Sequence, residues 1–261
     1  MNILLTNDDG IHSPGLWAIA EELAGIATVT VVVPDRDQSG MGASMTLLKP
    51  LSYERVESPT TRVEAAYTVQ GTPGDCVIMA TEHILESEPD LIVSGINQGA
   101  NLGLDVFNSG TFGAALHGYF RGIHSLAVSV LYKEDVIYGP SAVVGTILAQ
   151  CMLDWNSNEK LLLNLNLPAC EMEDIVAFDL TKLGPKAFLE NVESVQNGRR
   201  TFFWIKHNKP VYKNNIQGTD VWSVNNDRIS LTFVNPFLSD MNGVEPANVF
   251  TNIIEKRLNL I

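Results

Sequence analysis

The sequence is poor in cysteine and contains no long apolar run. Its three cysteines, Cys76, Cys151 and Cys170, form no C-x-x-C pair. An odd number without that spacing argues against a disulfide framework or a zinc ribbon and favours reduced thiols. No basic segment precedes an apolar one at the start, and the apolar stretch Ala142–Ala149 is far shorter than the ~20 residues that cross a bilayer. We therefore expect a soluble, cytoplasmic protein with no membrane partner.

Basic residues are also scarce. The chain has 17 Lys and Arg against 30 Asp and Glu, so its formal net charge is −13 at pH 7. A surface this negative repels nucleic-acid polymers, and we expect none as a partner. A small anion can bind only where a metal ion, backbone amides or a few local bases cancel its charge. The chain also lacks the lysine-containing phosphate loop and the G-x-G-x-x-G dinucleotide motif.

Short apolar runs alternate with helical patterns over the first two thirds of the chain. This alternation predicts an α/β fold, a Rossmann-like, doubly wound and mostly parallel sheet whose first crossover is right-handed. Ser13 and Pro14 are typical of a helix start, as N-cap and first residue. The expected strands are Asn2–Thr6, Thr28–Val33, Leu91–Ser94, Ser125–Val130 and Leu161–Leu165. The expected helices run from Pro14 to near Gly25 and over Pro73–Ile84, Thr111–Phe120 and Ser141–Met152.

The pattern changes after Pro168. Stretches such as Thr201–Ile205 and Ser230–Val234 are rich in aromatic and β-branched residues and show no helical period. We expect hairpins there that leave the main sheet and serve as an oligomerisation arm. The predicted division is a Rossmann-like core over 1–183, a protruding β-hairpin arm over 184–234, and a C-terminal segment over 235–261 with a short helix at Ala247–Arg257.

Oxygen-bearing side chains follow three of the expected strands. Asp8 and Asp9 come after the first strand, Ser39 after the second, and Asn97 after Leu91–Ser94. Ligands of open α/β sheets bind beyond the carboxyl ends of the strands, so these loops should meet. Two close carboxylates repel each other unless they share a cation or one takes a proton. The four side chains are hard oxygen donors that suit Mg²⁺ or Mn²⁺. The plainer alternative is a solvated turn, which a lone Asp-Asp-Gly fits equally well.

A second polar stretch, Asn108–Thr111, leads directly into an expected helix. The free N–H groups and the positive dipole of a helix start favour a phosphate group. The candidate phosphate-binding residues are Gly40, Asn97, Asn101, Ser109, Gly110 and Thr111. Seen alone, the Ser-Gly-Thr turn is more typical of a plain N-cap.

Three other features have structural interpretations. Thr72 before Pro73 predicts helix capping, and Cys76 in that helix is more typical of a small buried hydrophobe than of a nucleophile. His12 and His117 lie within reach of the candidate site, but packing or surface roles suit them better.

Six segments together resemble the SurE family, the survival-protein nucleotidases. They are "ILLTNDDGIHSPGL", "VVVPDRDQSG", "GTPGDCV", "SGINQGANLG", "NSGTFGAA" and "GTDVW", in order from residue 3 to about residue 222. The resemblance implies a divalent-metal phosphatase that acts on nucleoside monophosphates, with a Rossmann-like core and arms that form a homodimer or a homotetramer. It also implies one metal ion per subunit, held by the residues at Asp8, Asp9, Ser39 and Asn97.

The chain departs from the family pattern at two positions. Where the family often carries a His shortly after Ser39, this chain has Ala43, and His117-Gly118 stands where Glu-Gly is usual. Neither change touches a metal ligand, so we expect effects on rate or substrate preference and not on the chemistry.

The hypothesis that follows is hydrolysis of phosphomonoesters, with Asp8 or Asp9 accepting the proton of water. The sequence does not distinguish these two carboxylates as the base. The alternative from another class is a non-catalytic module that binds a nucleotide or a metal with the same loops. A phosphatase with a covalent aspartyl intermediate is disfavoured, because such enzymes carry Asp-x-Asp after the first strand, and here the pair is adjacent.

Overall fold

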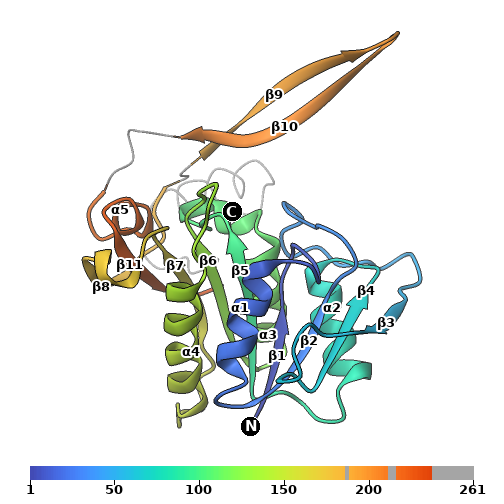
Figure 1. Cartoon of the computed structure of the whole chain (residues 1–261), viewed down its shortest axis with the longest axis vertical. Helices are drawn as coiled ribbons and strands as arrows, with labels where there is room; N and C mark the ends of the chain where they lie inside the picture. Colours follow the sequence, from blue (N-terminus) through green and yellow to red (C-terminus); the bar gives the residue numbers. More distant parts are fainter. Residues whose placement is uncertain (186–187, 211–215, 237–261) are drawn as a thin grey trace, which may run out of the picture.

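The computed structural model describes residues 1–185, 188–210 and 216–236. Within them, a large mixed sheet carries helices on both faces, and a long two-stranded hairpin projects from one end (Figure 1). The expected α/β, Rossmann-like fold with a hairpin arm is therefore confirmed. The expected helix Ala247–Arg257 lies outside the described residues.

The main sheet has nine described strands in the order β3-β4-β2-β1-β5-β6-β7-β11-β8. Pairing is parallel from β4 through to β7, whereas β3 is antiparallel to β4, and β11 is antiparallel to β7. The strands are β1 (Asn2–Thr6), β2 (Thr28–Pro34), β3 (Tyr53–Val56), β4 (Ala65–Val69), β5 (Leu91–Gln98), β6 (His124–Val130), β7 (Leu162–Leu167), β8 (Ala177–Thr181) and β11 (Arg228–Phe233).

Most of the apolar strands expected from the sequence are present, and several run further. The expected Leu91–Ser94 continues to Gln98, which carries Asn97 on the end of the strand itself. The prediction missed the edge strands β3 and β8 and the neighbouring β4, because these strands are short and lack a clear alternation of buried residues. The expectation that Ser230–Val234 leaves the main sheet is wrong, because β11 pairs with both β7 and β8.

The helices form a layer on each face of the sheet. They are α1 (Pro14–Leu23), α2 (Pro73–Met79), α3 (Gly110–Phe120), α4 (Gly139–Leu153) and α5 (Asp220–Val224), with short turns η1 (Ala80–Ile84), η2 (Gly103–Phe107) and η3 (Met172–Asp174). Helices α1 and α4 pack on one face over a large apolar core that includes Leu5, Val128 and Leu165. Helices α2 and α3 pack on the other face over a smaller core around Leu4 and Ile92. The expected helix Pro73–Ile84 is thus divided into α2 and the π-helical turn η1.

One crossover departs from the usual hand. The connections through α3 and α4 run in the same direction across the sheet, from β5 to β6 and from β6 to β7, yet the two helices cover opposite faces. The connection β6–α4–β7 therefore has the opposite hand to β5–α3–β6, and to β1–α1–β2, which is right-handed as expected (Figure 1). Right-handed crossovers account for about 98% of such connections, so α4 is an exception.

The hairpin consists of β9 (Phe188–Asn197) and β10 (Arg200–Pro210), which pair only with each other among the described strands. It extends away from the body of the molecule (Figure 1). Several apolar side chains on it are exposed, among them Phe203 at 67%, Trp204 at 60% and Ile205 at 77%. The hairpin therefore carries an exposed apolar surface.

The topology also places the functional edge of the sheet. Strands β1 and β5 are neighbours, and the chain leaves β1 towards β2 on one side and β5 towards β6 on the other. This reversal is the switch point at which open α/β sheets bind ligands. No helix among the described residues has both the length and the apolar character needed to cross a membrane.

Candidate active site

Three loops meet at the switch point and are joined by hydrogen bonds. The backbone N–H of Gln38, after β2, donates to the carbonyl of Asp8, after β1, at 2.8 Å. The N–H of Gly42 donates to the carbonyl of Asn108, in the loop before α3, at 3.0 Å. The loops that follow β1, β2 and β5 therefore form one continuous rim, as the sequence predicts.

Asp8, in the loop after β1, packs against the N-terminus of α3. Its side chain is 3% exposed, and its Oδ1 accepts a 2.6 Å hydrogen bond from the hydroxyl of Thr111. Gly110 packs directly against it, since a Cβ at position 110 would lie 2.8 Å from the Cβ of Asp8. Burial raises the pKa of Asp8, and the hydrogen bonds from the side chain and backbone of Thr111 oppose the rise. Asp8 is thus held rigidly at the positive end of a helix.

Asp9 is half-buried beside it and receives a 3.4 Å hydrogen bond from the hydroxyl of Ser13. Burial, then the charges of Asp8 and Asp37, raise the pKa of Asp9 to about 7. Among the described residues, no Lys or Arg forms an ion pair with either carboxylate of the Asp8–Asp9 pair. The structure therefore brings two acidic side chains together without a basic partner. This arrangement favours a bound cation.

Ser39 and Asn97 bring neutral oxygens to the same rim. The N–H and the hydroxyl of Ser39 both donate to Oδ1 of Asp37, at 2.7 and 2.6 Å, which fixes a tight turn. The amide nitrogen of Asn97 donates to the carbonyl of Gly99 at 2.6 Å, which leaves the amide oxygen on the other side. No cluster of three or more His, Cys, Asp and Glu that could hold a metal occurs among the described residues. Besides the two carboxylates, the predicted ligands of a metal at this rim are therefore the neutral oxygens of Ser39 and Asn97.

Asn101 is hydrogen-bonded to residues near the ends of two neighbouring strands, β6 and β7. Its N–H donates to Oδ1 of Asn166, and its carbonyl accepts from the amides of Asn164 and Asn166. Its own amide nitrogen donates to the hydroxyl of Ser129 at 2.8 Å. Strand β7 thus fixes the backbone of Asn101, and β6 fixes the orientation of its side chain.

The start of α3 is only partly open to a ligand. The hydroxyl of Ser109 accepts from the N–H of Phe112 as a true N-cap, and the hydroxyl of Thr111 is occupied by Asp8. The N–H of Ser109 donates to the carbonyl of Val106 at 3.3 Å, and the backbone of Thr111 is hydrogen-bonded to Asp8. A phosphate can therefore use the O–H of Ser109, which only accepts from Phe112, and the N–H of Gly110, but not the hydroxyl of Thr111. Gly40, opposite, is exposed, and nothing lies within 4 Å of a Cβ added there.

The two positions that depart from the family pattern touch each other. Nε2 of the buried His117 lies 3.0 Å from the carbonyl oxygen of Ala43, so the imidazole ties α3 to the loop that follows Gly40. The same loop is held by a carboxylate: Asp75 accepts from the N–H and hydroxyl of Thr46. Asp75 also completes the predicted capping of α2.

Two parts of the site differ from the sequence-based prediction. Ser13 occupies the N-cap position of α1 but makes no capping hydrogen bond with its side chain, because its hydroxyl is turned to Asp9. The sequence-based prediction did not include Tyr138. Burial and then the charge of Asp9 raise the pKa of the Tyr138 hydroxyl, so this side chain lies within the electrostatic influence of that carboxylate. Its position after the strand Ser125–Val130 was the available signal, because that loop reaches the same edge of the sheet.

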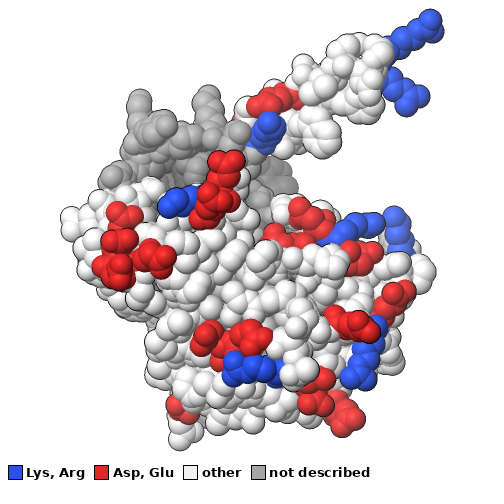
Figure 2. Space-filling view, viewed as in Figure 1, with Lys and Arg blue, Asp and Glu red and all other residues white. Residues whose placement is uncertain are grey.

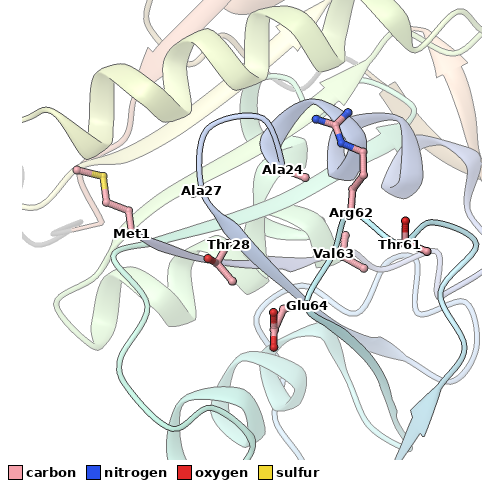
Figure 3. A pocket seen from close by; sticks show the side chains of 8 residues that line it. All are labelled: Met1, Ala24, Ala27, Thr28, Thr61, Arg62, Val63 and Glu64. Carbon is pink, nitrogen blue, oxygen red and sulfur yellow. The ribbon is translucent and has the colours of Figure 1, made fainter.

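A hollow of about 450 Å³ lies away from the candidate site. It is lined by Met1, Ala24, Ala27, Thr28, Thr61, Arg62, Val63 and Glu64 (Figure 3). Met1 and Thr28 stand at the amino ends of β1 and β2, at the opposite edge of the sheet from Asp8. Arg62 there is already paired with Glu21 at 3.2 Å.

Comparison with known proteins identifies the family. The family described as "Survival protein SurE" matches residues 3–190, more than half of the chain. The chain belongs to the SurE family. Its SurE relatives include the "5'-nucleotidase SurE" of Dehalococcoides mccartyi (strain CBDB1), 38% identical over 234 residues, which cover 89% of this chain and 88% of the relative. The protein of the same name from Geobacter sulfurreducens is 38% identical over 89% of this chain and 87% of its own length.

The fold agrees with that membership. The crystal structure of the SurE protein from Aquifex aeolicus superposes with a TM-score of 0.80 at 35% identity, and the match covers 97% of this chain and 100% of that one. The resemblance to the SurE family stated from six short segments is therefore confirmed over nearly the whole chain.

Proposed function

We propose that this SurE-family protein hydrolyses nucleoside 5'- and 3'-monophosphates to the nucleoside and phosphate, with a divalent metal ion. The observation that carries the proposal is the pair of buried Asp8 and half-buried Asp9, which lies at the switch point beside the start of α3 and forms no ion pair with a described Lys or Arg. Two further facts support a metal-dependent nucleotidase: the name of the curated relatives, and the scarcity of Lys and Arg in these loops, which leaves substrate charge for a metal to neutralise.

The residues at the rim fit one Mg²⁺ or Mn²⁺ ion per subunit. Asp8, Asp9, Ser39 and Asn97 would hold it, all through oxygen atoms, which these hard cations prefer. When bound, such an ion neutralises the substrate phosphate and makes water a better nucleophile near neutral pH.

The chain's own groups would perform the remaining tasks. One carboxylate of the pair accepts the proton of the attacking water, while Thr111 holds Asp8 in a single orientation. Of the predicted backbone donors, Ser109 and Thr111 are occupied by Val106 and Asp8. The N–H of Gly110, the hydroxyl of Ser109 and the side chain of Asn101 would therefore bind the phosphate oxygens. The open space at Gly40 admits the substrate.

Removing the metal should leave the enzyme almost silent. We expect EDTA-treated protein to release little phosphate from p-nitrophenyl phosphate or from mononucleotides, and added Mg²⁺ or Mn²⁺ to restore release. A screen of 5'- and 3'-mononucleotides with each metal then identifies the preferred substrate. Full activity without metal would contradict the proposal, and tight nucleotide binding in calorimetry without phosphate release would favour a non-catalytic binding module.

Thr111 offers a second test of the site. Thr111→Val removes the hydroxyl that orients Asp8 but keeps the shape of the side chain, so we expect kcat to fall by about 10- to 100-fold, as for other outer partners of metal ligands. The matched control is Thr6→Val, because the hydroxyl of Thr6 is fully buried on β1 and has no hydrogen-bond partner within the described part of the chain. Steady-state kinetics should show the control at wild-type activity. Equal losses in both variants would show that the Thr111 hydrogen bond has no special role.

We also propose that the protein is a cytoplasmic homodimer or homotetramer. The hairpin supports assembly because its apolar side chains are exposed on both of its faces. Figure 2 shows basic side chains at the tip of the hairpin, in the region of Arg199 and Arg200, and both acidic and basic groups over the body. The excess of acidic residues in the chain, 30 against 17 basic ones, favours contact between this basic tip and another subunit. The three cysteines are free, which suits a reducing compartment.

Polar substitutions on the hairpin should dissociate the assembly. Replacing Phe203 and Ile205 by Ser removes apolar area from a surface that a partner subunit would bury, so light scattering should show a shift to the monomer mass of 28.6 kDa. Lys206→Ser, which removes only an exposed ion pair with Glu193 on the same hairpin, is the control and should leave the mass unchanged. Unchanged mass in the double variant would place the interface elsewhere.

A further inference from the structure

Asp220, in the segment "GTDVW", is a fully buried carboxylate far from the metal-binding loops in sequence. Its Oδ2 accepts a 2.7 Å hydrogen bond from the N–H of Gly103, and its Oδ1 accepts from the N–H groups of Gly184 and Val221 at 2.7 and 2.8 Å. One side chain therefore joins three separate backbone segments: the loop after β5, the segment that leads to the hairpin, and the start of α5.

Gly103 belongs to the loop that carries the candidate phosphate-binding residues. It follows Asn101 by two positions, and η2, which begins at Gly103, leads to Ser109 and α3. Asn101 is anchored on its other side by Asn164 and Asn166 of β7. The hydrogen bond that Gly103 donates to Asp220 thus fixes the other end of the segment 101–103.

Apolar packing supports this anchor. Leu102, next to Gly103, is 2% exposed and packs against Val221 and Val224 of α5. A displacement of Asp220 would therefore move α5, and with it the two valines that pack against Leu102 of the loop.

The base of the hairpin touches the same point. Gly103 has a positive φ of 54°, and a Cβ there would lie 2.1 Å from the carbonyl oxygen of Pro185, so only glycine allows this approach. The N–H of Asp220 donates to the carbonyl of Lys182, which closes the two ends of the hairpin segment on each other. The phosphate-binding loop and the root of the arm are thus in direct backbone contact.

We propose that Asp220 is a positioning residue for the nucleotidase reaction: it holds the loop that presents Asn101 and Ser109 to the phosphate and ties that loop to the base of the arm. The proposal rests on the proposed function, because it assigns Asn101 to the substrate. It predicts an effect on substrate binding and turnover and none on metal affinity, because Asp8, Asp9 and Ser39 lie on other loops and Asn97 belongs to strand β5, ahead of the segment that Asp220 holds.

Asp220→Asn is the decisive variant. The amide keeps the size of the side chain but presents a donor to at least one backbone N–H, so the loop loses an anchor. We expect KM for a mononucleotide to rise about tenfold and kcat/KM to fall about 10- to 100-fold, as small displacements of positioning groups do, with Mg²⁺ affinity unchanged. Hydrogen exchange should accelerate in residues 99–109.

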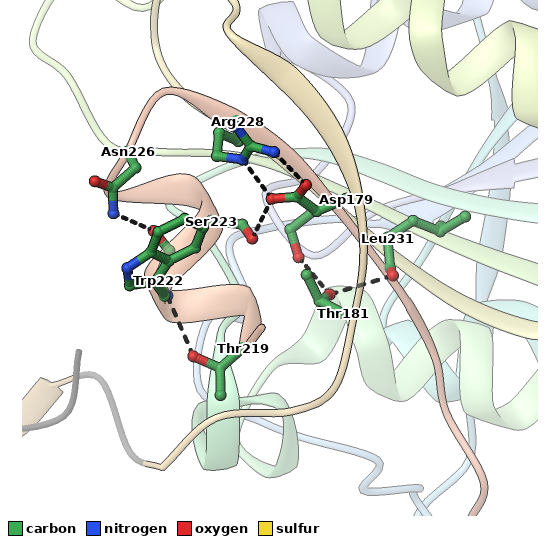
Figure 4. Close-up of polar contacts among 9 residues, drawn as sticks. Asp179, Thr181, Thr219, Trp222, Ser223, Asn226, Arg228 and Leu231 are labelled. Carbon is green, nitrogen blue, oxygen red and sulfur yellow. Dashed lines mark hydrogen bonds and ion pairs between the residues drawn. The ribbon is translucent and has the colours of Figure 1, made fainter. Parts of the chain in front are cut away.

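Asp179→Asn is the matched control. Asp179 binds Ser223 of α5 and Arg228 of β11 (Figure 4), so it fastens the same helix without touching the loop. We expect this variant to lower Tm while KM, kcat and exchange in 99–109 stay at wild-type values. Wild-type kinetics and exchange in Asp220→Asn, or an equal loss in Asp179→Asn, would overturn the proposal.

A milder variant and a separate readout keep the test decisive. If Asp220→Asn does not fold, Gly184→Ala serves instead, because its Cβ would lie 3.0 Å from Oδ1 of Asp220 and displaces that oxygen slightly. The same direction of change, at smaller size, is expected. A wild-type protein without nucleotidase activity would overturn the proposed function, and the exchange measurement would still decide whether Asp220 fixes the loop.

Discussion

Asp8→Asn should abolish most turnover while the fold is kept. The amide has the size of the carboxylate and its oxygen still accepts the hydrogen bond of Thr111, so only the negative charge that would bind the metal is lost. We expect kcat/KM to fall by more than about 100-fold, beyond the upper end of what the loss of an outer partner costs. Phosphate release measures the effect, calorimetry with Mg²⁺ should show weakened binding, and circular dichroism should match the wild type.

Two further variants test this prediction, one at Asp8 itself and one as a neutral control. Asp8→Glu keeps the charge but adds a methylene where Gly110 leaves no room, so we expect it to be inactive as well. Asp90→Asn is the neutral control, because Asp90 binds the N–H of Asn2 at the opposite edge of the sheet. Substantial activity in folded Asp8→Asn would remove Asp8 from the catalytic scheme.

Asp9→Asn should make the metal-free protein more stable at high pH. The pKa of Asp9 is about 7 in the folded protein and near 3.8 in the unfolded chain, so the folded state binds more protons between these values. Stability is therefore greatest below the unfolded pKa and is lost as the pH rises through 7. Between pH 5 and pH 8 we expect the variant to gain about 2 kcal/mol in the free energy of unfolding relative to the wild type.

Urea unfolding in EDTA at the two pH values measures this gain. Added Mg²⁺ should reverse the order at pH 8, because a ligand bound only by the folded wild type stabilises it by mass action. Asp154→Asn, at an exposed position on the end of α4, should change stability by less than about 0.5 kcal/mol at either pH. If the difference in unfolding free energy between Asp9→Asn and the wild type did not depend on pH, burial and the neighbouring charges would not raise the pKa of Asp9.

The sequence predicted the rim because its signals are local. A buried strand followed by Asp8 and Asp9, and a helix that starts after Ser109, can be identified from a few neighbouring residues. The meeting of the loops then follows from the general geometry of parallel sheets. The assignment of metal and phosphate roles to these residues stays a prediction that the variants above test.

The supports of the site could not be predicted in the same way. Ser129, Asn164 and Asn166 sit within strands that read as apolar runs, and their roles depend on which face of the sheet they occupy. Asp220 acts through Gly103, which is distant in sequence, so no short pattern reveals the contact. The place of β11 between β7 and β8 is likewise a matter of long-range pairing.

The hand of the β6–α4–β7 connection has a consequence for the whole enzyme. Because α4 shares a face with α1, β7 and β11 turn leucines towards it, whereas Asn164, Asn166, Ser230 and Thr232 point to the other side. On that other side, Asn164 and Asn166 bind the loop that contains Asn101, and Asp220 joins the same loop to the segment that leads to the hairpin. The direction taken by one helix thus leaves the proposed phosphate-binding loop and the base of the proposed assembly arm next to each other.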